Sequence, residues 1–306
     1  MTTVTDAILI AGPTASGKSA AALALAKELH GTIINADSMQ VYRDLRVLTA
    51  RPDETDLQAA PHRLYGTVAA QEPYSVGRWA SEAAAAIDEA REQGRMPILV
   101  GGTGLYFKVL LEGLSPVPGI PTEIRDLWRR RADTVTAQVL HDELSVRDPI
   151  MATRLQPSDP QRLVRALEVI NATGVSLADW QGVAGTPVLD GNAVLTLVVA
   201  PEREDIYTAI DSRLESMLCA GAIEEVKALT ALGLAEGLPV MRALGVRALA
   251  AYLAGTMSLE DAATRAKTES RRYAKRQMTW AKRFMSDWQW FPNPEAAAAS
   301  VRINLR

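Results

Sequence analysis

The sequence is poor in the residues that build disulfides and metal centres. It contains one cysteine, Cys219, and three histidines, His30, His62 and His141. A single cysteine excludes an internal disulfide and a thiol-rich metal site, and the scattered histidines lack the spacing of metal ligands. We therefore expect a protein of a reducing compartment whose chemistry rests on other side chains.

Long apolar runs and an excess of positive charge are also missing. Residues 1–6 carry no basic segment, and no apolar stretch is long enough to span a bilayer, so we expect a soluble cytoplasmic protein without membrane contact. The net charge of −3 argues against indiscriminate binding to polyanions through overall charge. A chain of 306 residues, of which 48% are hydrophobic, can form one large or two modest globular domains.

The most informative motif lies near the N-terminus, directly after the apolar run 7–11. Its residues are Gly12, Pro13, Thr14, Ala15, Ser16, Gly17, Lys18 and Ser19, which fit the pattern G-x-x-x-x-G-K-[ST]. Backbone N–H groups of such a loop converge on a polyphosphate, the lysine adds a charge, and the serine hydroxyl can hold Mg²⁺. The motif predicts binding of a diphosphate or triphosphate and leaves open whether the ligand is ATP.

The order of apolar and amphipathic segments predicts an α/β fold. Strands are expected at 7–11, 32–36 and 97–100, and helices at 19–29, with Gly31 ending that helix, and at 78–93. Strands that alternate with helices indicate a parallel sheet whose carboxyl edge carries the active site.

A change of composition after Leu114 suggests a second domain. The proline-rich segment 115–121 precedes the expected helices 122–146 and 160–173, and the β-branched run 194–200 then resumes strand character before further helices to about residue 285. We predict a phosphate-loop NTPase-like core formed by residues 1–116 and 190–306, and a helical insertion at 117–189.

Two further features are expected at the carboxyl edge of the sheet. Asp37 follows the second strand, where its carboxylate has three roles open to it: a ligand of Mg²⁺, an acceptor of a proton, or a cap of the following turn. The turn 101–104, Gly-Gly-Thr-Gly, stands where many phosphate-loop NTPases carry a magnesium-binding aspartate. Its glycines either admit a ligand close to the backbone or serve only a tight turn.

Basic residues are clustered in spite of the acidic total. Residues 265–283 contain eight lysines and arginines and one acid, Glu269. Smaller groups surround Arg125 and Arg162. Each group alone is typical of a solvated helix face, but three together favour surfaces that meet nucleic-acid phosphates.

The motifs together resemble those of the tRNA dimethylallyltransferases, in the order of that family. The matching blocks are the phosphate loop 12–19, Asn35 to Tyr42, Pro97 to Tyr106, Arg162 to Val169, and Tyr273 to Trp280. The resemblance implies transfer of a dimethylallyl group from dimethylallyl diphosphate to N6 of the adenosine immediately 3′ of the anticodon, so the loop would grip the diphosphate of a prenyl donor.

The resemblance also implies roles for individual residues. Asp37 would be the general base, Thr103 would position the reacting centre, and Lys18 with Mg²⁺ held near Ser19 would stabilise the leaving diphosphate. Arg213 would reach the diphosphate, although an ordinary surface cation remains open at that position. The residues expected to contact tRNA are Asp37, Ser38, Met39, Gln40, Thr103, Arg125, Gln161, Arg162, Leu163, Val164, Arg165, Lys275 and Arg276.

Residues 43–51 depart from the usual sequence of the family, which puts the role of that loop in doubt. We expect a monomer that binds the anticodon stem-loop. The alternatives are a small-molecule or nucleoside kinase that uses ATP at the same loop, and a nucleotide-binding regulatory protein that binds RNA without chemistry.

Overall fold

The protein, seen in a computed structural model that describes residues 5–304, forms two compact units. Residues 1–4, part of the segment expected to lack a targeting signal, lie outside the described residues. The smaller unit is Glu112–Pro187, for which the sequence suggested the limits 117–189, and the larger unit is made by the chain on both sides of it. Among the described residues, none of the helices combines the length and apolar character needed to cross a membrane.

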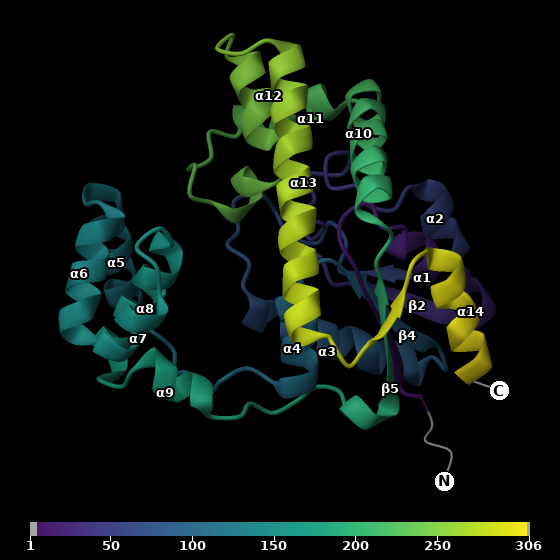
Figure 1. Ribbon diagram of the computed structural model, residues 1–306, viewed down its shortest axis with the longest axis horizontal. Coiled ribbons are helices and arrows are strands. Elements are labelled where there is room, and N and C mark those ends of the chain that lie inside the picture. The colour runs from purple at the N-terminus through teal and green to yellow at the C-terminus, as the bar shows by residue number, and fades with distance from the viewer. Residues whose placement is uncertain (1–4, 305–306) are drawn as a thin grey trace. The chain divides into compact units, whose positions relative to one another are not determined.

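The larger unit is built on a parallel sheet of six strands, as the sequence predicts (Figure 1). The order across the sheet is β3-β2-β4-β1-β5-β6, with all neighbouring pairs parallel. The strands are β1 (Ala7–Ala11), β2 (Gly31–Asn35), β3 (His62–Arg63), β4 (Met96–Gly101), β5 (Val194–Val199) and β6 (Gln289–Phe291). Gly31 opens β2 and does not end the preceding helix.

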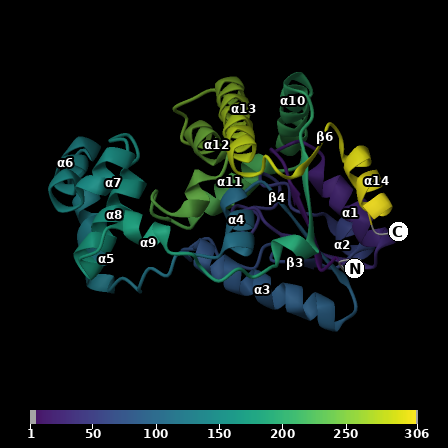
Figure 2. The ribbon, with the colours of Figure 1, turned by 60° about the horizontal axis from the view of Figure 1, so that its bottom comes forward.

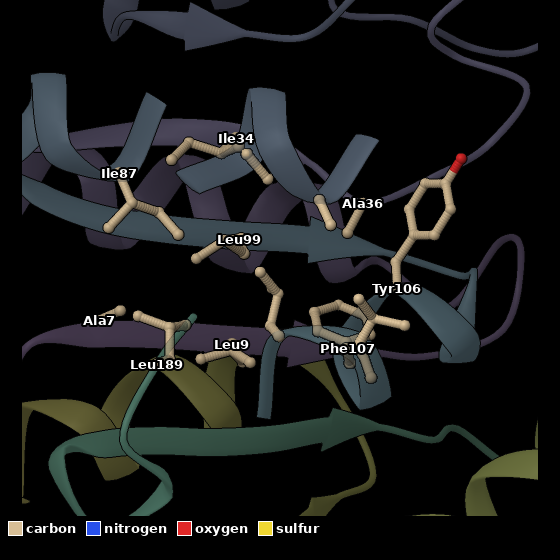
Figure 3. Packing of buried hydrophobic residues seen from close by; sticks show 14 of the residues in the cluster. Ala7, Leu9, Ile34, Ala36, Ile87, Leu99, Tyr106, Phe107 and Leu189 are labelled. Carbon is tan, nitrogen blue, oxygen red and sulfur yellow. The ribbon is translucent and has the colours of Figure 1, made fainter. Parts of the chain in front are cut away.

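The central strands are apolar along their whole length because helices cover both faces of the sheet. On one face α1 (Lys18–Glu28) and α14 (Pro294–Asn304) lie side by side in both ribbon views and pack on Ile8, Ile10 and Ile98 (Figures 1 and 2). On the other face α3 (Val76–Glu92) and α4 (Gly104–Glu112) contribute Ile87 and Phe107, which pack with Leu9, Leu99 and Ile34 (Figure 3).

A layer of helices follows β5 and adjoins the carboxyl edge of the sheet. It consists of α10 (Arg203–Cys219), α11 (Ala222–Ala231), α12 (Val246–Leu253) and the long α13 (Leu259–Phe284). In Figure 1, α13 runs beside α10 and α12 and contacts both. Their apolar side chains form one cluster with Val41, Tyr42 and Leu45 of the segment after β2. The shorter pieces of this unit are α2 (Glu54–Ala59) and the 3₁₀ helices Gly191–Ala193 and Pro239–Arg242.

The smaller unit is entirely helical. Its helices are α5 (Thr122–Thr134), α6 (Ala137–Arg147), α7 (Pro149–Arg154), α8 (Pro160–Thr173) and α9 (Leu177–Gly182). Trp128, Leu144 and Leu163 are buried in its core. The single helix expected at 122–146 is two helices, because the chain is extended at Val135 and Thr136, and the Thr136 side chain caps α6.

Candidate active site

The phosphate loop connects β1 to the first turn of α1. Gly17 adopts the left-handed conformation with φ of 84°, and Ala15 lies at φ of 63°. This conformation turns the chain into the helix so that the helix N-terminus, with its partial positive charge, faces the concave side of the loop. Gly12 is equally constrained, because a Cβ there would lie 2.5 Å from the carbonyl oxygen of Val199.

Lys18 is folded back onto its own loop. Its Nζ donates a hydrogen bond of 2.9 Å to the carbonyl oxygen of Pro13. Burial lowers the pKa of Lys18 to about 8, while the negative charge of Asp37 acts in the opposite direction and the positive charge of Arg213 lowers the pKa further. The negative charge near Lys18 is thus too small to offset the cost of burying its ammonium. An anion bound in the loop would supply the missing charge.

The two serines of the loop differ in their surroundings. The Ser16 side chain is buried, and its Oγ has no hydrogen-bond partner among the described residues. Ser19 is exposed on the first turn of α1. No group of three or more acidic, histidine or cysteine side chains within residues 5–304 could hold a metal by itself, so a cation here would need oxygen atoms from a ligand or water beside Ser19.

Asp37 sits in a turn that the buried Asn35 side chain organises. The amide of Asn35 accepts a hydrogen bond from the Asp37 N–H at 2.8 Å and donates to the carbonyl oxygens of Asp37 and Leu64. The carboxylate Oδ1 of Asp37 accepts a hydrogen bond from the Met39 N–H at 2.9 Å. The capping role considered for Asp37 is thus present, and it holds the half-buried carboxylate in one orientation.

Thr103 joins this turn to the end of β4. Its Oγ1 accepts a hydrogen bond from the Ser38 N–H at 3.0 Å, and its own N–H donates to the carbonyl oxygen of Ala36. Tyr273 of α13 lies close to Thr103, whose side chain lowers the pKa of the Tyr273 phenol against the effect of burial. The segments that carry Asp37 and Thr103 are therefore fixed to each other, with Tyr273 beside them.

The glycines around Thr103 accommodate protein atoms. A Cβ on Gly101 would lie 2.0 Å from the carbonyl oxygen of Ala36, and a Cβ on Gly104 would lie 2.1 Å from the ring of Trp280. The close approach that the sequence suggested for a ligand is thus made by the chain itself. Because the space beside Gly101 is filled by backbone, this strand end has no room for the aspartate that many phosphate-loop NTPases carry.

The negative charge of Asp37 raises the pKa of groups in five segments of the larger unit. It raises the pKa of Lys18 and of Arg213, although burial lowers the pKa of both. Three phenols are also affected: burial raises the pKa of Tyr65, Tyr106 and Tyr273, and the charge of Asp37 raises it further. All three stay protonated at neutral pH, so the groups near the carboxylate include two cations and three neutral phenols.

Arg213 is delivered to this region by α10. Its guanidinium is half-buried, and it lines a small cavity of about 50 Å³ together with Thr14 of the phosphate loop. Leu48, Met217 and Leu244 supply apolar walls to the same cavity. Arg213 is therefore not fully exposed, and its contact with a diphosphate stays a prediction.

Comparison with known proteins identifies the family. A family model described as IPP transferase matches residues 40–284. The chain belongs to the IPP transferase family. A tRNA dimethylallyltransferase of Methylocella silvestris is 52% identical over 295 residues, which cover 96% of this chain and 97% of that protein. One from Bradyrhizobium sp. (strain ORS 278) is 51% identical over 304 residues, or 99% of this chain and 98% of the relative.

Solved structures of the IPP transferase family share the fold. The tRNA isopentenylpyrophosphate transferase of Bacillus halodurans is 32% identical, with a TM-score of 0.68 over 97% of this chain and 96% of that one. A eukaryotic dimethylallyltransferase described as acting on tRNA is 29% identical, with a TM-score of 0.76 over 90% of this chain and 69% of that one. The family and the prenyltransferase class expected from the sequence are confirmed, and nothing favours the kinase.

The turn after Asp37 supports the loop 43–51. The Gln40 amide donates hydrogen bonds to the carbonyl oxygens of Thr49 and Ala50. Glu225 of α11 accepts hydrogen bonds from three consecutive backbone N–H groups, at residues 46–48. The amide N–H groups of Gln40, a residue expected to contact RNA, are thus bound to the loop. Ser38 and Met39 are half-buried beside Asp37.

Only part of the basic segment on α13 is open to a ligand. Arg265, Lys267 and Arg271 form ion pairs with Glu269, Glu215 and Asp211. Lys275 and Arg276 are exposed, and no carboxylate within residues 5–304 pairs with either. Tyr273, Gln277 and Trp280 share a neighbouring face of α13, and the Arg276 guanidinium lies over the Tyr273 ring at its edge. Trp280 packs against Gly104 and the core.

The remaining residues expected to bind RNA lie in the smaller unit. Arg125 is half-buried on α5, and Gln161 and Arg162 are exposed at the start of α8. Arg165 lies 3.5 Å from the carboxylate of the buried Glu168. Leu163 is a correction: its side chain is fully buried in the core of the smaller unit, so it does not reach a ligand on the surface.

Two residues of the site were not singled out from the sequence. Asn35 orients the Asp37 turn, and Gln277 contacts both the phosphate loop and the glycine-rich turn. Both lay within motif blocks that match the family. Nothing in their residue type or spacing indicated their hydrogen-bond partners, which lie in loops and turns beside the strand ends.

Proposed function

We propose that this chain transfers a dimethylallyl group from dimethylallyl diphosphate to N6 of the adenosine immediately 3′ of the anticodon in tRNA. The observation that carries the proposal is the meeting of Asp37, Lys18 and Arg213 at the carboxyl edge of the sheet, where the charge of Asp37 acts on both cations. Family membership supplies the class of reaction, and this arrangement supplies an anion site beside a carboxylate.

The phosphate loop binds the diphosphate of the donor. Backbone N–H groups from Ala15 to Ser19 and the Lys18 ammonium surround the terminal phosphate, and Arg213 approaches from α10. These donors are held in place before the ligand arrives, so they stabilise the negative charge that grows on the leaving diphosphate. The Lys18 ammonium, poorly compensated in the free protein, gains most from that charge.

Mg²⁺ fits at the exposed hydroxyl of Ser19. A hard cation takes oxygen ligands, and a serine hydroxyl with phosphate oxygens and water provides them. The ion would supply additional positive charge next to the diphosphate. No other role is assigned to it.

Asp37 is the general base in this proposal. The exocyclic amine of adenine is a poor nucleophile because its lone pair is delocalised into the ring. Its nitrogen forms a bond to the allylic carbon while the bond from that carbon to the diphosphate oxygen breaks, and the oxygen keeps the electron pair. The N6 proton passes to the carboxylate of Asp37, whose orientation Met39 and Asn35 maintain.

Recognition of RNA is proposed for two surfaces, each within its own unit. Lys275 and Arg276 on α13 would meet backbone phosphates. Arg125, Gln161, Arg162, Val164 and Arg165 of the smaller unit would grip the anticodon loop. The target base is stacked in free RNA, so it must be turned out of the loop to reach Asp37. Because one chain supplies all these residues, we propose a monomer.

The direct test uses purified protein, unmodified anticodon stem-loop RNA and dimethylallyl diphosphate, with and without ATP. The proposal expects an adenosine whose mass has increased by one dimethylallyl group, and release of diphosphate without any need for ATP. Hydrolysis of ATP without prenylation would support the kinase instead. RNA binding without either reaction would support the regulatory protein.

A further inference from the structure

One side-chain amide bridges the two halves of the site. Gln277, on the inner face of α13, accepts a hydrogen bond from the Thr14 N–H at 2.8 Å and donates one to the carbonyl oxygen of Gly102 at 2.9 Å. Thr14 belongs to the phosphate loop after β1, and Gly102 belongs to the turn after the adjacent β4. The amide therefore connects the donor-binding loop to the turn that carries Thr103.

The glycine at position 102 is matched to this contact. A Cβ on Gly102 would lie 2.1 Å from Nε2 of Gln277. Any larger residue would push the amide away from the carbonyl oxygen that it contacts. The glycine-rich turn is thus shaped around the side chains of α13, Gln277 at this position and Trp280 at Gly104.

The helix that carries Gln277 is itself held on both sides of that residue. One turn before it, Tyr273 lies close to Thr103. Close to one turn after it, Trp280 fills the space over Gly104. Residues spaced in this way share one face of a helix. The amide consequently reaches the loop and the turn from a fixed point.

We infer that Gln277 is a positioning residue, which sets the separation between the diphosphate cradle and the Asp37–Thr103 edge where the amine is received. The inference rests on the proposed function. Gln277 touches neither substrate in this scheme. It removes the Thr14 N–H from the donors available to the diphosphate and fixes the loop from which the others project. Displacement of reacting groups by even about 1 Å slows transfer strongly.

Glutamine suits this role because one planar group carries an acceptor and a donor side by side. A carboxylate accepts from the Thr14 N–H but repels the Gly102 carbonyl oxygen. When the carboxyl group is protonated, its carbonyl oxygen can accept from the Thr14 N–H and its O–H can donate to the Gly102 carbonyl oxygen. Methionine matches the length of the side chain and makes neither hydrogen bond.

These differences define the experiment, which compares Gln277→Met, Gln277→Glu and the unchanged protein in single-turnover transfer to anticodon stem-loop RNA. We expect Gln277→Met to lower the single-turnover rate constant about 10- to 100-fold, with RNA affinity within about twofold of the unchanged protein. Gln277→Glu should be equally slow at pH about 8. Its rate, divided by that of the unchanged protein, should rise as the pH falls toward about 5.5, whereas the ratio for Gln277→Met should stay flat.

Gln93→Met is the matched control, because it makes the same chemical change just before β4, at the opposite end of that strand. Thermal unfolding of each variant identifies a general loss of structure. Two results would overturn the inference. One is a single-turnover rate constant of Gln277→Met within about twofold of the unchanged protein. The other is a rate of Gln277→Glu, relative to the unchanged protein, that does not change with pH. If the unchanged protein transfers no prenyl group, the proposed function fails by itself. The inference is then judged by calorimetric binding of inorganic pyrophosphate, which should be weakened in Gln277→Met and not in Gln93→Met.

Discussion

The hydroxyl of Thr103 accepts a hydrogen bond from the backbone N–H of Ser38 at 3.0 Å, which fastens the turn of Asp37 to the end of the neighbouring strand β4. Replacing Thr103 by valine keeps the shape of the side chain but leaves that N–H without its acceptor, at a cost of about 1 to 3 kcal/mol in unfolding free energy. We expect single-turnover transfer to fall about tenfold or more. Thr103→Ser retains the hydroxyl and should restore most of the rate. Equal rates for the valine and serine variants would contradict this role.

Donor affinity should depend on the charge of Lys18. Burial lowers the pKa of Lys18 to about 8 in the free protein, and a bound diphosphate raises the pKa again. Binding of dimethylallyl diphosphate is therefore expected to be strongest below pH about 8, to weaken as the pH rises above that value, and to take up a proton there. Calorimetry in buffers of different ionisation enthalpy measures both effects. Lys18→Arg keeps its charge throughout and should bind with much less dependence on pH.

The exposed cations of α13 should govern RNA binding. We expect Arg276→Ala to weaken binding of the anticodon stem-loop and to lower the slope of log affinity against log salt by about 1, as the loss of one phosphate contact requires. Arg265→Ala is the matched control on the same helix, because Arg265 already pairs with Glu269. Filter binding across a range of salt concentrations tests the difference. Identical slopes for the two variants would show that this face of α13 does not meet RNA.

Glu225 should stabilise the folded protein through its contacts with the loop 43–51. Its carboxylate accepts hydrogen bonds from the N–H groups of Arg46, Val47 and Leu48. Glu225→Ala is expected to lower the free energy of unfolding by about 1 to 3 kcal/mol. The neighbouring Glu224 is exposed in the same first turn of α11, so Glu224→Ala should cost about 0.5 kcal/mol or less. Urea denaturation measures both changes, and equal losses would argue against the loop contact.

Much of the fold follows from local signals in the sequence. The runs at β1, β2, β4 and β5 are mostly apolar because helices cover both faces, and such runs are typical of buried parallel strands. The phosphate loop and the position of Asp37 after β2 follow from the same pattern. In contrast, β3 has two residues and β6 has three, too few to show any alternation, and neither strand was expected.

The contacts of the site were less accessible to sequence reasoning. The glycine-rich turn could be recognised, but its purpose depends on Gln277 and Trp280, which arrive from a helix far along the chain. The basic segment 265–283 was visible as a whole, while the pairing of Arg271 with Asp211 depends on how α10 and α13 pack. Such contacts and ion pairs depend on which segments pack together in the fold, and the composition of a segment does not show them.

The central claim is that Asp37 removes the proton from the attacking amine. Asp37→Asn tests it most directly, because the amide oxygen can still accept the hydrogen bond from the Met39 N–H and so keep the turn in place. Transfer and donor affinity should be measured together at pH about 7, where Lys18 retains its charge. The account predicts that single-turnover transfer falls about 10²- to 10⁴-fold while the affinity for dimethylallyl diphosphate stays within about threefold. Loss of donor binding in parallel with transfer, or transfer at the unchanged rate, would contradict it.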